Sequence, residues 1–341
     1  MSTRVEIRRR LIVTVAAFGS LAVASCLLAP LAGSTPISLA RALDRTAPFA
    51  DNVDAQIFFV ARLPRVLAAA LVGGSLATAG AVFQALLRNP LASPDTLGVS
   101  GGAALGAMIA ITFHAQFTLF GIPSVPLASF AGSLGALAIV YLLATARRHG
   151  LSTTALLLAG VTLTAFFSAV VLFIQYLASY ADTFRSVRWL MGSLDIGSYA
   201  PLVGVLPILA AAAAGLVTVP RALDIMSLGS DAAASRGVDV RRIERLALGS
   251  ASLATGAAVS VGGPVSFVGL VVPHLVRLMV GSDHRLVLPA AFLFGSSFLV
   301  ACDLIARTVF SPLELPVGII TALIGGPFFL WLLVTRTRGP L

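Results

Sequence analysis

Residues 62–86, RLPRVLAAALVGGSLATAGAVFQAL, decide the fold class of this chain. Two arginines, Arg62 and Arg65, flank a proline, and no charged residue follows until Arg88. An α-helix needs about 20 apolar residues to cross the hydrocarbon core of a bilayer, and this run is long enough. The stretch therefore predicts a membrane-spanning helix with two positive charges at its mouth.

The whole composition agrees with this interpretation. Of the 341 residues, 58% are hydrophobic and 11% are charged, and the mean hydropathy is +0.98. Soluble domains carry about 25% charged residues, because a water-facing surface cannot be built from fewer polar groups. All 23 basic residues are arginine, so the lysine that a Walker A phosphate-binding loop requires is absent. We expect an all-α polytopic membrane protein without a P-loop ATPase site of its own.

About ten stretches are apolar and long enough to span a membrane, within a single domain of residues 1–341. They are 11–31, 62–86, 96–114, 124–146, 152–178, 199–219, 243–262, 267–281, 286–309 and 316–335. Stretch 267–281 is short and is expected to be tilted or partly re-entrant. The first stretch follows four arginines and contains VASC, like a lipoprotein signal, but its apolar run continues past Cys26. We interpret it as an uncleaved span.

The arginines predict the orientation of the spans. With the N-terminus in the cytoplasm, ten spans return the C-terminus to the cytoplasm. The outer side then holds Arg41, Arg45, Arg62, Arg65, Arg185, Arg188 and Arg307. The other sixteen arginines fall on the cytoplasmic side, as the positive-inside rule requires. This bias explains the net charge of +9 without any nucleic-acid partner.

An internal repeat is indicated by two similar octapeptides. SLATAGAV at 75–82 recurs as SLATGAAV at 252–259. The first copy lies in a span that runs inward and the second in a span that runs outward, an inverted arrangement common in transporters. A chance match between two stretches rich in small residues is the alternative.

The longest polar stretch, residues 220–245, is expected to form two short cytoplasmic helices. We expect Asp224 to cap the first and Gly229 to end it, and Ser230 to cap the second and Gly237 to end it. Such a structured, charged element suggests a docking surface for another protein. A solvated helix pair without a partner is the alternative interpretation.

The sequence offers no catalytic or metal-binding constellation. The four histidines and two cysteines lack metal-ligand spacing. Asp303 and Arg307 are four residues apart and share one helix face, either as a self-satisfied pair near the outer boundary or as a relay or partner contact. A proton-driven secondary transporter would usually need acids near mid-membrane, and an intramembrane enzyme would need paired catalytic residues. The residues thus favour the membrane subunit of an ATP-driven transporter over both.

Several long motifs resemble the FecCD-type permeases, the membrane subunits of type II ABC importers for iron chelates and cobalamin. They are RLPRVLAAALVGGSLATAGAVFQALLRNPLASPDTLGVSGGAALGA at 62–107, LSTTALLLAGVTL at 151–163, GPVSFVGLVVPHLVRLMVGSDHR at 263–285 and ELPVGIITALIGGPFFLWLL at 314–333. The resemblance covers most of the chain from about residue 56 onward. It implies the ten-helix permease fold of these importers.

The resemblance also implies partners. It implies a homodimer in the bacterial inner membrane, two separate ATP-binding subunits that carry ATP and Mg, and a periplasmic binding protein that delivers cargo. No cofactor would be bound by this chain itself. Cargo would be a ferric siderophore, haem or cobalamin, with specificity residing mainly in the binding protein.

Site residues follow from the same resemblance, position by position. Arg62, Arg65 and Arg307 would receive glutamates of the binding protein at the outer surface, and we expect Pro64, in the first helical turn, to hold Arg62 and Arg65 facing outward. Coupling helices at 222–240 would contact the ATPase through Gly229, Arg236 and Gly237. A cytoplasmic gate would be formed by Asn89, Leu91, Thr153 and Thr154.

Overall fold

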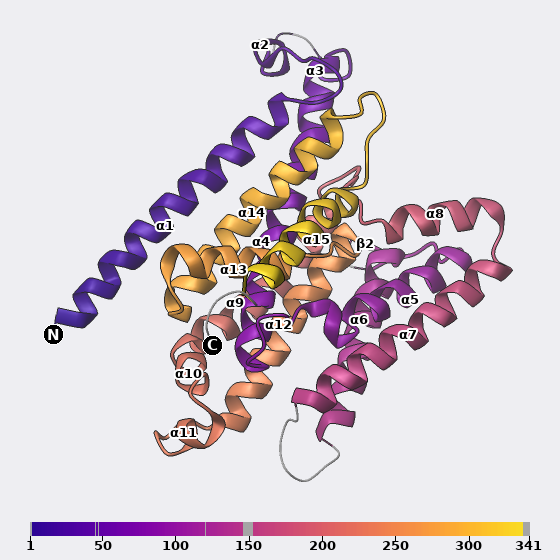
Figure 1. The fold of residues 1–341 in the computed structure, drawn as a ribbon. Helices are drawn as coiled ribbons and strands as arrows, with labels where there is room; N and C mark the ends of the chain where they lie inside the picture. Colours follow the sequence, from indigo (N-terminus) through magenta and orange to yellow (C-terminus); the bar gives the residue numbers. More distant parts are fainter. Residues whose placement is uncertain (1, 45, 47, 120, 146–152, 337–341) are drawn as a thin grey trace.

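The structure is a computed structural model that describes residues 2–44, 46, 48–119, 121–145 and 153–336. It is almost entirely helical, and Figure 1 shows the chain from the outer segment at the top to the polar helices at the bottom. The helices and strands are α1 (Ser2–Leu28), η1 (Ala29–Leu31), α2 (Leu39–Ala42), α3 (Val53–Gln56), η2 (Ile57–Arg62), α4 (Leu63–Leu86), η3 (Pro94–Leu97), α5 (Val99–Thr112), β1 (Thr118–Leu119), β2 (Ile122–Pro123), α6 (Ser124–Thr145), α7 (Thr153–Leu177), α8 (Tyr180–Leu190), α9 (Ala200–Thr218), α10 (Pro220–Met226), α11 (Ser230–Ala234), α12 (Val240–Gly262), α13 (Val268–Val280), α14 (His284–Thr308) and α15 (Val317–Arg336).

Each of the ten predicted spans coincides with a helix, so the all-α fold class is confirmed. Within the described residues, six helices are long and apolar enough to cross a membrane. Helix α13 covers only Val268–Val280, about 20 Å, which is less than the roughly 30 Å of a hydrocarbon core. It packs inside the protein against α4 and α14, in agreement with the short span expected there.

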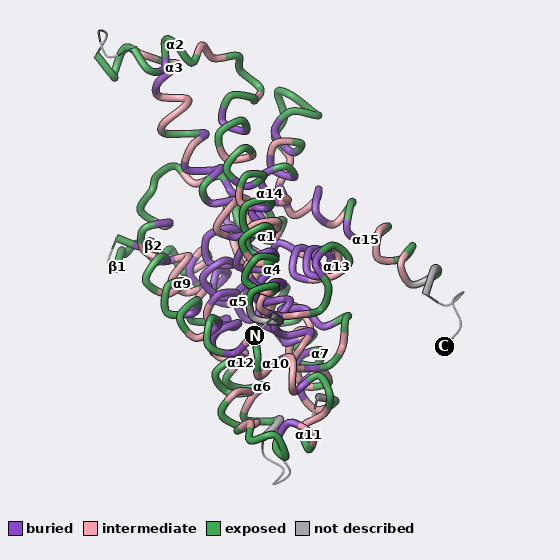
Figure 2. Tube along the Cα trace, turned by 90° about the vertical axis from the view of Figure 1, so that its left-hand side faces the viewer, coloured by how far each residue is buried: buried purple, intermediate pink, exposed green. Residues whose placement is uncertain are grey.

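Helix α4 is the centre of the molecule. It packs against α12, α13 and α14, and its residues from Gly73 to Gln84 are all buried. Figure 2 shows this buried core in purple, with the exposed α1 in green beside it. The α4–α14 crossing is close because Gly73 meets Gly295: a Cβ on Gly73 would lie 2.3 Å from the Gly295 carbonyl oxygen. Glycines thus allow the backbones to approach, as is usual where membrane helices cross.

The arrangement around α4 and α12 supports the inverted repeat. These two helices carry the similar octapeptides and pack against each other. Helix α4 packs against α13 and α14, and α12 packs in the same way against α5 and α6. If one repeat begins α4–α5–α6 and the other α12–α13–α14, the first helix of each repeat contacts the second and third helices of the other. Two intertwined halves would pack in this way.

The start of the second span differs from the expectation. Pro64 was expected in the first turn of a helix, but helix continues without a break from Val53, and residues 57–62 form a π-helical segment. The Leu63 N–H bonds the Phe58 carbonyl, five residues back, and the next bond of this kind would need the N–H that Pro64 lacks. The Tyr199 hydroxyl donates to the Phe59 carbonyl instead, at 2.7 Å. The proline is tolerated because a neighbouring segment supplies the missing donor.

Among the elements that the sequence did not predict are the short β1–β2 hairpin between α5 and α6, helix α2, and α8, an amphipathic helix that packs on α5. Ser179 caps α8 by accepting the Asp182 N–H at 3.2 Å. A serine followed three residues later by an acid is a helix-start signal in the sequence.

Candidate functional site

The three arginines predicted to face outward are buried where the start of α4 and the end of α14 meet, at the end of the molecule predicted to be the outer one. The exposed fractions of Arg62, Arg65 and Arg307 are 6%, 7% and 2%. Between them lies Asp303, which is completely buried. The expectation of an outward-facing pair is therefore wrong, because partners within the chain surround these side chains.

Asp303 bridges two of the arginines. Arg65 Nε lies 2.9 Å from Asp303 Oδ1, and Arg307 Nε lies 3.0 Å from Asp303 Oδ2. Arg65 also bonds Glu314, whose side chain is 42% exposed and precedes α15. We call these four residues, together with Arg62, the outer arginine cluster: Arg62, Arg65, Asp303, Arg307 and Glu314. The buried Asp303 carboxylate lies against two buried guanidinium groups, and Glu314 supplies Arg65 with a second carboxylate. Buried ions need charged partners of this kind, because removing them from water is costly.

The remaining guanidinium donors hold the segment that follows α1. Arg62 donates to the carbonyls of Pro30, at 3.1 Å, and of Thr35. Arg307 donates to the carbonyls of Ala29 at 3.2 Å and Ala32 at 3.3 Å. The cluster thus ties α4 and α14 to η1 and to the loop before α15. These contacts all lie within the chain, so the cluster stabilises the fold. The predicted contact with a binding protein stays a prediction.

Two of the residues predicted for the gate, Asn89 and Leu91, follow the end of α4 that is predicted to face the cytoplasm. Asn89 Oδ1 accepts the Leu91 N–H at 2.9 Å, which folds the loop after α4. Asn89 and Leu91 line a cavity of about 190 Å³ together with Leu270, Val271 and His274 of α13 and Phe328, Phe329 and Leu332 of α15. The structure therefore brings two of the four gate residues into one largely apolar cavity.

The other two gate residues lie on a different helix. Thr154 is exposed in the first turn of α7, and Thr153 starts that helix with its side chain outside the described part. Thr154 is not among the residues that line the cavity. The gate as a unit of four residues remains a prediction.

The polar stretch after α9 forms the two short helices expected, α10 and α11 (Figure 1). Gly229 adopts φ 115° and ψ 149°, a conformation available essentially to glycine alone, and precedes α11. Gly237 has φ 79° and ends α11, as predicted. Arg236 and Gly237 are exposed to solvent, so a partner can reach them.

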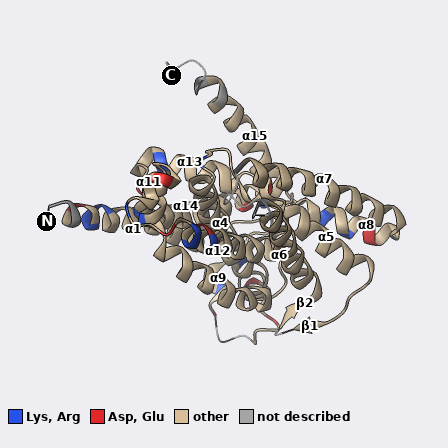
Figure 3. Cartoon of the chain, turned by 90° about the horizontal axis from the view of Figure 1, so that it is seen from below, with Lys and Arg blue, Asp and Glu red and all other residues tan. Residues whose placement is uncertain are grey.

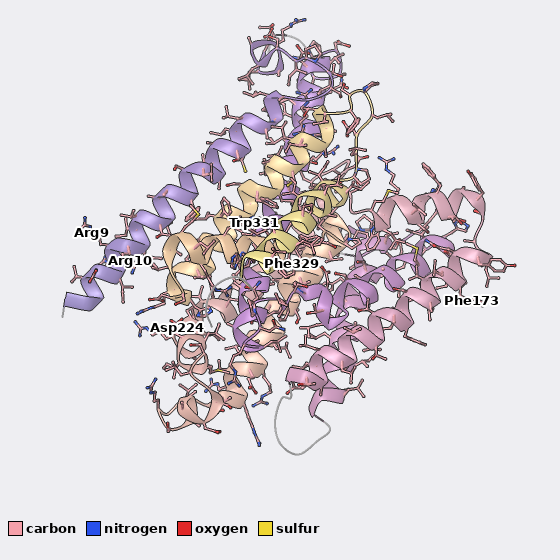
Figure 4. The ribbon with its side chains drawn as sticks, in the orientation of Figure 1. Arg9, Arg10, Phe173, Asp224, Phe329 and Trp331 are labelled. Atoms are coloured by element: carbon pink, nitrogen blue, oxygen red, sulfur yellow. The ribbon has the colours of Figure 1, made fainter. Side chains whose placement is uncertain are left out.

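Two capping assignments in this stretch are wrong. Helix α10 begins at Pro220, and Asp224 lies inside it instead of capping it. Asp224 Oδ1 accepts the backbone N–H of His284 at 2.9 Å, so it holds α10 against the first turn of α14. Figure 4 labels Asp224 at this place, beside the lower end of the bundle. Ser230 is the first residue of α11, and Gly229 takes the cap position.

A polar pocket that the sequence did not indicate opens beside α10. Its volume is about 570 Å³, and Arg88, Arg277 and Arg285 lie in its wall with Asp224 and Asp283. No group of three or more histidine, cysteine or acidic side chains in the described residues could hold a metal ion. Figure 3 shows that most of the chain is uncharged, with charged residues visible near α11, on α1 and on α8.

Comparison with known proteins agrees with this fold. The pattern of the FecCD transport family matches residues 21–335. The chain is 45% identical over 275 residues to the cobalamin import system permease protein BtuC of Halobacterium salinarum, covering 81% of this chain and 72% of that protein. It is 41% identical over 279 residues to the hemin transport system permease protein HmuU of Yersinia pestis, covering 81% and 82%.

A solved structure shows the same architecture. An inward-facing metal-chelate type ABC transporter superposes with a TM-score of 0.82 at 30% identity, covering 94% of this chain and 98% of that one. The helices, the family match and this likeness define a multi-pass membrane permease. The chain belongs to the FecCD transport family. The resemblance noted in the motifs is thereby confirmed.

Proposed function

We propose that this chain is the permease subunit of an ATP-driven importer that moves a large metal chelate, of the cobalamin or haem class, into the cytoplasm. It would work as a homodimer in the bacterial inner membrane, with both termini in the cytoplasm. Two separate ATP-binding subunits would supply the energy, and a periplasmic binding protein would deliver the chelate. Similarity to cobalamin and hemin permeases supports this cargo class.

The observation that carries the proposal is the exposed pair of helices α10 and α11. This pair folds against α14 through Asp224, yet Arg236 and Gly237 remain open to solvent. Because the chain lacks a lysine for nucleotide phosphates, a surface that receives force from another subunit is required for ATP-driven transport. We propose Gly229, Arg236 and Gly237 as contacts of that surface.

A gradient-driven transporter is disfavoured by the surroundings of Asp303. Asp303 carries the one buried carboxylate in the described membrane-spanning helices. It lies between two arginines near the end of α14. A carrier of protons must gain and lose its proton during each cycle. A carboxylate held at 2.9 and 3.0 Å by two guanidinium groups is a poor site for such exchange.

Docking of the binding protein is proposed at the outer arginine cluster. Glu314 is the exposed member, and it occupies one edge of the Arg65 guanidinium. An incoming carboxylate would replace Glu314 there, because arginine presents a planar set of donors suited to carboxylates. Glu314→Gln should then tighten docking several-fold. The control is Asp195→Asn, which removes the partner of the exposed pair Arg188–Asp195 and should leave docking unchanged.

Uptake into proteoliposomes tests the function. The permease is reconstituted with the ATPase and binding protein encoded by neighbouring genes. Uptake of cobalamin, haem and a ferric siderophore is then measured with ATP inside the vesicles. Uptake of one chelate that depends on ATP is the expected result. Uptake driven by a pH gradient without ATP would contradict the proposal.

A further inference from the structure

A groove of about 880 Å³ lies between α1 and the cytoplasmic halves of α4, α9 and α14. Its walls are mostly apolar, with side chains such as Leu11, Val15, Ala213 and Phe292. Ile7, Leu11 and Val15 are spaced four apart, so they form one face of α1. This volume is within the range of roughly 300–1,000 Å³ that holds small organic ligands.

Positive charge gathers at one end of the groove. Arg8 of α1, Arg221 of α10 and Arg285 of α14 line it there, and no acidic side chain lines it in the described part of the chain. Arg285 is occupied by Asp283, which accepts from its Nε at 2.9 Å. The side chains of Arg8 and Arg221 are exposed and make no ion pair or hydrogen bond within the described residues.

The groove is as deep as one leaflet of a bilayer. Ser75 lines its far end, about three turns from the end of α4 at Leu86, or about 16 Å along the helix axis. On α9 it extends from Leu209 to Thr218, about 14 Å. Half of a hydrocarbon core is about 15 Å thick. The arginines therefore lie at the level of lipid headgroups when the apolar walls lie at the level of acyl chains.

We propose that the groove binds one anionic phospholipid of the cytoplasmic leaflet. Its phosphate lies between Arg8 and Arg221, and its acyl chains lie along Leu11, Ala213 and Phe292. Arginine donates to phosphate through a planar set of N–H groups, and the cytoplasmic leaflet is the one rich in anionic lipids. A second protein would have to bring carboxylates to the same depth, which costs free energy that a lipid phosphate at the interface avoids.

The bound lipid would fill the space between α1 and α9. Helix α1 packs mainly against α14, and only 6% of the residues in its most apolar stretch are buried. The phospholipid thus replaces protein contacts that α1 lacks on this side. The inference is independent of which chelate is transported.

Lipid titration of the purified full-length permease, followed by native mass spectrometry, tests the site. Phosphatidylglycerol is compared with phosphatidylcholine of the same acyl chains. The double variant Arg8→Gln/Arg221→Gln should bind phosphatidylglycerol about 30-fold more weakly, which corresponds to about 1 kcal/mol for each arginine near the headgroup. The matched control is Arg9→Gln/Arg242→Gln, which removes two exposed cytoplasmic charges outside the groove and should bind normally. Figure 4 shows Arg9 pointing away from the other helices.

A second variant keeps the charges and obstructs the apolar wall. Ala213→Trp is made at an exposed position, so the fold tolerates it, and it should weaken phosphatidylglycerol binding at least tenfold. Soluble glycerol phosphate should not compete. The proposal is overturned if the charge variant and its control bind phosphatidylglycerol equally well, or if phosphatidylcholine binds as well as phosphatidylglycerol. It is also overturned if glycerol phosphate competes, or if Ala213→Trp binds phosphatidylglycerol with full affinity. If the charge variant instead keeps its lipid but no longer copurifies with a protein that the unmodified permease retains, the groove binds that protein and the proposal is wrong.

Discussion

The two ends of this permease hold their arginines in opposite ways. At the outer end Arg62, Arg65 and Arg307 are buried and bonded within the chain. At the end predicted to face the cytoplasm, Arg236 and Arg242 are exposed and make no ion pair in the described part of the chain. Arg62, Arg65 and Arg307 therefore contribute to the stability of the fold, whereas Arg236 and Arg242 are available to partners. Variants at the two ends should separate stability from assembly.

The largest effect is expected from Asp303→Ala. It leaves Arg65 and Arg307 buried without their shared carboxylate, and removal of one partner from a buried ionic group costs about 3–5 kcal/mol. Thermal unfolding of the purified permease in detergent should show a large drop in the midpoint. Asp195→Ala, in the exposed pair with Arg188, should cost no more than about 1 kcal/mol. Equal midpoints for the two variants would mean that the outer cluster is not structural.

Gly229→Ala should have its effect on assembly. A side chain at φ 115° and ψ 149° costs about 1–3 kcal/mol locally, so the link between α10 and α11 must change shape. Copurification of the ATP-binding subunit should fall at least tenfold, while the unfolding midpoint changes little because α11 has only five residues. Gly197→Ala is the control, since its Cβ would meet nothing within 4 Å. Normal copurification by Gly229→Ala would remove this glycine from the coupling surface.

Tyr199→Phe tests the outer end on a smaller scale. It removes the hydroxyl that bonds the Phe59 carbonyl, and such a loss costs about 1 kcal/mol. The midpoint of thermal unfolding should fall slightly. Tyr180→Phe is the control, because Tyr180 is 91% exposed and makes no hydrogen bond in the described residues. An unchanged midpoint in Tyr199→Phe would show that water replaces the hydroxyl there.

The smallest effect is expected from acid titration of Asp283 at the cytoplasmic end. Hydrogen bonds donated by Arg285 lower the pKa of this carboxyl below its ordinary value. Its contribution to stability is therefore present above about pH 4 and is lost as the pH falls through the lowered pKa. Asp283→Asn should remove that part of the acid dependence of the unfolding midpoint. If the unfolding midpoint falls with acid in the same way in both proteins, ionisation of Asp283 contributes nothing measurable to stability.

Much of this fold could be predicted because local patterns carry it. The spans were found from runs of apolar residues, and Gly237 was found from its place after a short polar helix. The burial of Arg65 could not be predicted in the same way, since its partner Asp303 is 238 positions away in the chain. For the same reason the sequence did not indicate that Asp224 bonds the start of α14, 60 residues further on.

By itself, the sequence determined that this is a helical membrane permease of the FecCD family. It also determined where the long apolar helices lie and where the polar stretch 220–245 interrupts them. Hydrophobicity and helix-ending glycines act over a few neighbouring residues, so a linear pattern is enough to reveal them. The tertiary structure decided which arginines are buried, which carbonyl Tyr199 satisfies and where Arg8 and Arg221 meet an apolar groove. These depend on which distant helices pack together, because the free energy of a charge depends on what surrounds it after folding.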